Sequence, residues 1–89
     1  MEGVTEGRIV HYIKPDWDTK GPGDFVEGQE YRHLPAIIVR VWDKERGYVN
    51  LQVFTDGSND GYNGNVVWKT SIEYSEEPKP NTWHWPERA

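Results

Sequence analysis

The densest group of polar side chains that could do chemistry lies in TDGSND, residues 55–60. Its carboxylate, hydroxyl and amide groups surround Gly57, at a spacing like the start of a calcium-binding loop with oxygen ligands. The remainder of that motif is missing, because neither a terminal bidentate glutamate nor flanking helices accompany it. We therefore favour a turn whose Asx side chains hydrogen-bond their own backbone, with a ligand-contacting loop as the alternative. The candidate ligand contacts are Asp56, Ser58, Asn59 and Asp60.

A second candidate set lies on two neighbouring strands of a predicted hairpin. Asn50 and Gln52 point outward from one strand, and Arg40 and Trp42 lie on the strand beside it. Amides can hydrogen-bond the edge of a base, a guanidinium can pair with phosphate, and an indole can stack. This combination suits a nucleotide, and an ordinary solvent-facing sheet surface is the simpler interpretation.

A third candidate is the aromatic segment TWHWPE, residues 82–87. An extended backbone places Trp83 and Trp85 on one face and His84 on the other. Paired indoles can stack on bases, at roughly 1–3 kcal/mol for each base. The same rings can instead plug one end of a barrel, and we favour that structural role because the chain has little aliphatic mass.

The remaining residues lack a pattern that would make a catalytic or metal site. His11, His33 and His84 are the only imidazoles and belong to different segments. A metal site would need them to converge with a carboxylate, which their spacing cannot show, so we expect structural or surface roles. No serine lies in a nucleophile elbow, GPG at 21–23 opens no helix that could cradle phosphate, and cysteine is absent. We predict no catalysis and no bound metal or cofactor.

The elements that must position these residues are strands, since apolar and polar residues alternate and no window has a helical period. The third strand alternates most cleanly, and the DKERG loop before it, which ends in Gly47, has the chemistry of an antiparallel hairpin. The fourth strand is long, so we expect a bend near Thr70 and Ser71. The predicted strands and the final aromatic piece are residues 7–13, 35–42, 48–54, 66–74 and 81–88.

The alternation also predicts which side chains share a face. In the second strand, Ile37, Val39 and Val41 form the apolar face, and Ala36, Ile38, Arg40 and Trp42 form a mixed one. In the third strand, Val49, Leu51 and Val53 point inward.

Loops rich in turn formers separate the strands within a single domain, residues 1–89. Residues 14–34 form a long irregular loop, and residues 55–65 contain three glycines and three asparagines. A proline-containing connector covers residues 75–82. Five or six short antiparallel strands in this pattern predict an all-β fold, a small SH3-like β-barrel. An OB-like barrel is disfavoured because no sequence is present for its usual helix between the third and fourth strands.

Composition and charge limit the partners. Aromatic residues make up 13% of the chain, with five Trp and five Tyr, which distinguishes it from disordered chains. The formal net charge of −5 and the scattered Lys and Arg leave no basic stripe for a long nucleic acid. No apolar run reaches the roughly 18 residues of a membrane span, and the N-terminal residues lack a signal core. We expect a cytoplasmic protein that binds neither membranes nor long nucleic acids.

Several short segments carry a resemblance to a known group of proteins. GRIVHY, LPAIIVRVW, VNLQVFTDGSND, VVWKTSIEYSEE and TWHWPER together resemble short uncharacterised proteins of tailed bacteriophages and prophages. The resemblance covers roughly two thirds of the chain and leaves out residues 14–34. It implies a viral gene that acts inside an infected bacterium, and it transfers no mechanism.

These observations predict a non-enzymatic phage protein that counters bacterial defence by sequestering a small cyclic nucleotide signal. The pocket would be lined by Arg40, Trp42, Asn50, Gln52 and the TDGSND loop. So short a chain cannot easily enclose a nucleotide alone, so we expect a homo-oligomer with the pocket near an interface. Two alternatives stay open: an inhibitor that binds a host defence protein through an acidic aromatic surface, and a virion or assembly component.

Overall fold

The alternating segments form strands at nearly the predicted positions. The structure, a computed structural model, describes residues 1–15, 17–18 and 20–87. Asp16, Thr19 and Arg88, which belong to predicted segments, lie outside the described residues. Two short 3-10 turns lie within the long loops. In chain order the elements are β1 (Ile9–Ile13), η1 (Pro22–Asp24), β2 (His33–Asp43), β3 (Tyr48–Phe54), η2 (Gly57–Asp60), β4 (Val66–Tyr74) and β5 (Thr82–His84).

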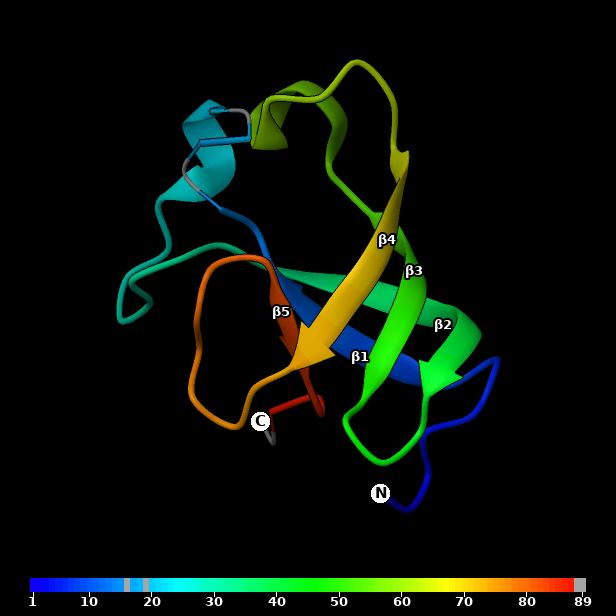
Figure 1. Ribbon diagram of the computed structural model, residues 1–89. Coiled ribbons are helices and arrows are strands. Elements are labelled where there is room, and N and C mark those ends of the chain that lie inside the picture. The colour runs from blue at the N-terminus through cyan, green and yellow to red at the C-terminus, as the bar shows by residue number, and fades with distance from the viewer. Residues whose placement is uncertain (16, 19, 88–89) are drawn as a thin grey trace.

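The five strands close into a barrel in the order β1-β2-β3-β4-β5 (Figure 1). β5 pairs antiparallel with β1 and parallel with β4, and the other neighbouring strands are antiparallel. The loop between β4 and β5, orange in Figure 1, carries the chain back along the barrel, so both strands run in the same direction. The predicted all-β fold is confirmed, and the barrel is compatible with a small SH3-like barrel. The expectation of antiparallel pairing throughout was wrong at β4 and β5.

The described residues include no α-helix, and therefore no helix with the length and apolar character that a membrane span requires.

The core fills the barrel and contains one large aromatic ring from the last strand. Trp83 is fully buried, and its indole nitrogen donates a 2.7 Å hydrogen bond to the carbonyl oxygen of Gly47. Tyr74 and Trp85 pack edge-on against it, with ring centroids 4.9 and 5.1 Å away. The preferred core role of Trp83 is confirmed, so this ring cannot contact a ligand. The other buried apolar residues are Val4, Val10, Tyr12, Ile13, Leu34, Ala36, Ile38, Val49, Leu51, Val53 and Ile72.

A bulge in β2 changes which side chains point inward. Ala36 and Ile38 are fully buried, whereas Val39 is exposed. The pairing with β3 skips Val39, because Ile38 pairs with Leu51 and Arg40 pairs with Asn50. One extra residue reverses the alternation of a strand, so the prediction that Ile37, Val39 and Val41 share one face was wrong: Val41, beyond the bulge, packs against the core, whereas Val39 is exposed.

β4 contains a second irregularity, close to the predicted bend. It is one continuous strand, but its pairing with β3 shifts register opposite Asn50. Thr70 and Ser71 lie at this shift, and Ser71 has a positive φ of 57°. A β-bulge at Thr70 and Ser71 thus replaces the expected division into two strands.

Candidate functional site

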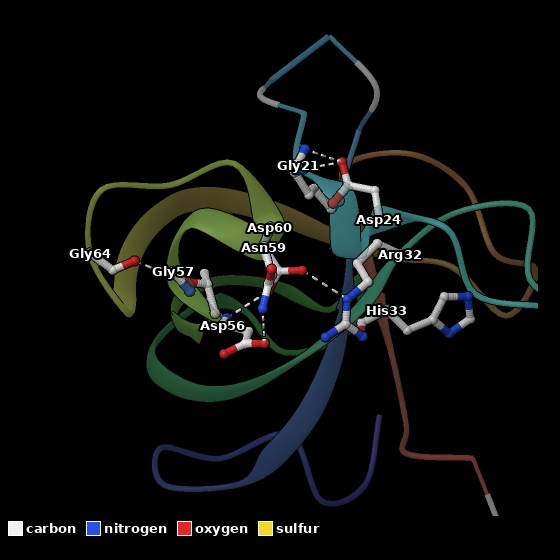
Figure 2. A network of polar contacts seen from close by, with 11 residues as sticks. Gly21, Asp24, Arg32, His33, Asp56, Gly57, Asn59, Asp60 and Gly64 are labelled. Carbon is white, nitrogen blue, oxygen red and sulfur yellow. Dashed lines mark hydrogen bonds and ion pairs between the residues drawn. The ribbon is translucent and has the colours of Figure 1, made fainter.

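The polar residues of TDGSND hold two loops together (Figure 2). Asp60 is fully buried, and its carboxylate accepts hydrogen bonds from the backbone nitrogen of Asp56 at 2.6 Å and from Nε of Arg32 at 2.9 Å. The side-chain amide of Asn59 donates to Asp56 at 2.8 Å, and Ser58 is exposed. These contacts agree with the preferred interpretation of a turn stabilised by its own Asx side chains.

The loop of residues 14–34 lies against this turn. Lys14 is almost fully buried and contacts Asp24 at 2.6 Å, and the same carboxylate oxygen accepts a hydrogen bond from the backbone of Gly21 (Figure 2). A Cβ on Gly21 would come within 2.3 Å of the carbonyl oxygen of Asn59, so the two loops are in close backbone contact. An open depression of about 330 Å³ adjoins this loop and contains none of the predicted contacts; it is lined by Lys20, Gly21, Pro22, Asp24, Phe25, Gln29 and Glu30.

The predicted group around Asn50 is brought together, but Asn50 is used internally. It is only 6% exposed, and its Oδ1 accepts hydrogen bonds from Nε1 of Trp42 at 2.8 Å, Oγ1 of Thr70 at 2.9 Å and the backbone nitrogen of Ser71 at 2.9 Å. The guanidinium of Arg40 lies over the Trp42 ring, 4.9 Å from its centroid. Asn50 therefore stabilises the bulge of β4, and its carbonyl oxygen is already saturated with donors.

Gln52 belongs instead to a row of outward side chains that crosses four strands. Ile9 pairs with Ile37, Ile37 pairs with Gln52, and Gln52 pairs with Trp68. Directly paired residues point to the same face of a sheet, and Trp68 remains 56% exposed. Phe54 and Val66 form the next pair on this face. We call these residues the outer apolar face: Ile9, Ile37, Gln52, Phe54, Val66 and Trp68.

The last strand separates its side chains as predicted. Trp83 and Trp85 contact each other, and the guanidinium of Arg8 lies over the Trp85 ring, 5.3 Å from its centroid. His84 has no part in that cluster and lies instead beside the other two histidines, with ring centroids 5.8 Å from His11 and 5.1 Å from His33.

The barrel topology explains why these three histidines meet. His11 in β1 pairs directly with His84 in β5, and His33 in β2 pairs with Ile13, two residues along β1 from His11. Side chains two positions apart on a strand share a face, so all three rings lie on the same outer surface of β2, β1 and β5. Glu87, three residues beyond His84, completes what we call the histidine cluster: His11, His33, His84 and Glu87.

The carboxylate of Glu87 contacts one nitrogen of every ring in the cluster. Nδ1 of His33 lies 2.5 Å from Oε1, Nε2 of His84 contacts the same oxygen, and Nδ1 of His11 contacts Oε2. The side chains of His33 and His84 are about one-tenth exposed, whereas that of Glu87 is 44% exposed. The rings therefore form a partly buried floor that the carboxylate covers from the solvent side.

The charge of Glu87 reflects these contacts. Burial raises the pKa of the carboxyl group, but hydrogen bonds from His84, from the backbone of Glu87 and from His33 and His11 lower it by more, and the pKa falls to about 2. The carboxylate is consequently ionised at neutral pH and accepts hydrogen bonds from the ring nitrogens. Nδ1 of His84 is buried and has no hydrogen-bond partner in the described part of the chain, so the polar contacts of this ring fall on Nε2.

Sequence reasoning missed two parts of these surfaces. Glu87 belongs to the TWHWPE segment but received no predicted role, although its distance of three residues from His84 is a usable local signal. Trp68 was assigned to a strand but not to a surface, and the pairing of Gln52 with Trp68 becomes known only once the register is fixed. The expected structural or surface roles of His11 and His33 gave no reason to connect them with His84.

The described residues thus present two surfaces with the chemistry to bind a partner or an ion. The outer apolar face offers exposed hydrophobic area, and the histidine cluster offers three ring nitrogens and a carboxylate. Family models, curated proteins and solved structures give no significant match to the chain.

Proposed function

We propose that this protein is a non-enzymatic binding protein that docks a bacterial protein on its outer apolar face. The observation that carries the proposal is the continuous row of outward residues from Ile9 through Ile37 and Gln52 to Trp68. Contiguous apolar patches on soluble proteins mark interaction sites more often than scattered apolar residues do. Trp68 supplies the kind of large exposed ring that dominates binding energy at protein interfaces.

The position of Trp42 extends this surface. Its ring is 57% exposed and is fixed by the hydrogen bond to Asn50 and by Arg40 above it. A ring held in one orientation loses little conformational entropy on binding. Tryptophan and arginine are both enriched among the residues that contribute most binding energy at interfaces, so Trp42 and Arg40 support recognition of a protein.

Two features favour a protein partner over a nucleotide. The Asn50 oxygen that would read a base already accepts three hydrogen bonds, and Trp83 is in the core. A sheet surface with aromatic rings suits a broad partner, whereas a small ligand needs an enclosing concavity. The phage resemblance supports a bacterial partner met in the cytoplasm of an infected cell, and a net charge of −5 favours one with a basic rim.

The test compares Trp68→Ala with Phe25→Ala, because Phe25 is also a large aromatic side chain and is 84% exposed in a loop away from the outer apolar face. Each protein is immobilised at the same density and exposed to bacterial lysate, and the captured protein is then purified and titrated by calorimetry. We expect Trp68→Ala to weaken that complex at least about tenfold and Phe25→Ala to leave it unchanged. Equal affinity of the wild type and Trp68→Ala would exclude the outer apolar face.

Two further measurements separate the alternatives. Calorimetric titration with cyclic di- and trinucleotides, with no bacterial protein present, should give no heat; stoichiometric binding would replace the protein partner with a nucleotide. Sedimentation velocity tests the expected homo-oligomer, and a dimer dissociated by Trp68→Ala would identify a second copy as the occupant of the face.

A further inference from the structure

The histidine cluster gathers every histidine of the chain at one point. The sequence contains three histidines, and all three lie in this cluster although they come from β1, β2 and β5. Each ring turns one nitrogen toward the same carboxylate. If the histidines were only ordinary polar residues, there would be no reason for all three to lie on one side of one glutamate.

The geometry points to a metal site: we propose that His11, His33, His84 and Glu87 bind one divalent transition-metal ion, with Zn²⁺ as the reference ion. Three imidazole nitrogens with one carboxylate oxygen form a donor set that suits Zn²⁺ and its neighbours in the first transition row. Ca²⁺ and Mg²⁺ prefer sites made entirely of oxygen. The inference is independent of the outer apolar face, which uses none of these residues.

The four donor atoms need only small movements to surround one ion. They all lie within 4.8 Å of one another, whereas donors about 2.1 Å from a tetrahedral ion are about 3.4 Å apart. Rotation of the Glu87 side chain, which is 44% exposed, makes room for an ion between the carboxylate and the ring nitrogens that it now contacts. The strand pairing of His11 with His84 already fixes the backbone beneath two of the ligands.

The number of protein ligands indicates a structural ion. Structural zinc sites are closed by four protein ligands, whereas catalytic sites keep one position for water or substrate. Here the fourth position is taken by Glu87, which covers the solvent side of the rings. The ion would therefore hold protein segments together, and its position shows which ones.

The ligands span the place where the barrel closes. β5 has three residues and pairs with β1 at two positions, His11 with His84 and Tyr12 with Trp83. An ion bound by His11 and His84 links these two strands, His33 adds β2, and Glu87 adds the segment after β5. A small domain without cysteine gains stability from such a link in the way that other small domains gain it from disulfides.

The test uses the full chain without a histidine tag, treated with a chelator and then titrated with Co²⁺ and Zn²⁺. We expect one ion per chain, visible absorption bands of four-coordinate Co²⁺, and displacement of Co²⁺ by Zn²⁺ but not by Mg²⁺ or Ca²⁺. At free Zn²⁺ about 100 times the Kd, the Tm should rise by about 10–20 °C. Absence of the cobalt bands, or an unchanged Tm at saturating Zn²⁺, would overturn the proposal.

Variants identify the ligands. His33→Asn should weaken Zn²⁺ binding at least about 100-fold and Glu87→Gln at least about tenfold, since even indirect partners of metal ligands are worth 10–100-fold. Glu77→Gln removes the same charge from an exposed position in the connector and should bind Zn²⁺ like the wild type. Circular dichroism of the metal-free proteins checks folding, and Glu87→Gln keeps the test decisive because its side chain is partly exposed. Wild-type affinity in either ligand variant would overturn that residue's assignment.

Discussion

Asp60 and Glu87 are two carboxylates at the centres of polar clusters, and they differ in what holds them. Asp60 is fully buried and is held by the backbone of Asp56 and by Arg32. Glu87 is 44% exposed and is held by three imidazoles. The backbone donor to Asp60 cannot move away unless the turn unfolds. The histidine nitrogens, in contrast, can give up their hydrogen bonds to Glu87 and bind a metal ion instead. The first arrangement serves the fold, and the second leaves ligand capacity available.

The largest expected effect contrasts these two carboxylates directly. Asp60→Asn removes the charge that compensates Arg32 in a buried setting and should lower the free energy of unfolding by about 3 kcal/mol. Glu87→Gln, measured with a chelator present, should lower it by less than about 1 kcal/mol, as for other partly exposed ion pairs. Urea unfolding followed by the fluorescence of the buried Trp83 and its neighbours measures both. Equal losses would break the distinction between the two clusters.

A smaller effect tests whether the Asp60 cluster acts by locking two loops together. Gly21→Ala places a methyl group 2.3 Å from the Asn59 carbonyl oxygen and from the Gly61 nitrogen, and it should cost about 2 kcal/mol through overpacking. Gly64→Ala is the matched control, because nothing lies within 4 Å of the added carbon, and it should change stability by less than about 0.5 kcal/mol. Similar unfolding midpoints for the two variants would show that the loops tolerate separation.

The smallest effect concerns Asp18, a carboxylate held by the side chains of Lys69, at 2.8 Å, and Tyr62. Burial raises its pKa, but hydrogen bonds from Lys69 and Tyr62 and the charges of Lys69 and Lys14 lower it by more, so the pKa lies below its ordinary value. A pKa depressed by folding gives stability above the unfolded pKa of about 3.9, and this stability is lost as the pH falls through the folded pKa.

Asp18→Asn should therefore reduce the urea midpoint at pH 7, and the difference from wild type should shrink as the pH falls below the unfolded pKa and through the folded one. Glu27→Gln, a charge change at an exposed position, serves as the control and should follow the wild type at each pH. A difference that stays constant from pH 7 to pH 2 would mean that Asp18 contributes through shape and not through charge.

Strand positions could be read from the sequence because burial on one face imposes a period of two. The pattern of Val49, Leu51 and Val53 predicted β3 with its correct bounds. The same rule failed in β2, since the bulge at Val39 adds a residue that no local pattern reports. The parallel pairing of β5 was also beyond local patterns, because it depends on how the proline-containing connector crosses the barrel.

The candidate site was less predictable than the fold because it depends on register. TDGSND drew attention through local density, yet Asp60 and Asn59 use their polar groups inside the protein. His11, His33 and His84 had no local signal, and only the pairing of β1 with β2 and β5 brings them to one surface. Whether distant residues meet depends on how the strands pair. A single sequence predicts where the strands are, but it does not predict their order or register.

The pairing of the first strand with the last also constrains the order of events during synthesis. β1 emerges early from the ribosome and can pair with β2 on one side, but its other edge has no neighbour until β5 has been made. A nascent chain therefore carries an open strand edge until β5 has been made, and such edges recruit other chains. Protection of that edge until β5 pairs with it should determine how much of the newly made protein escapes aggregation.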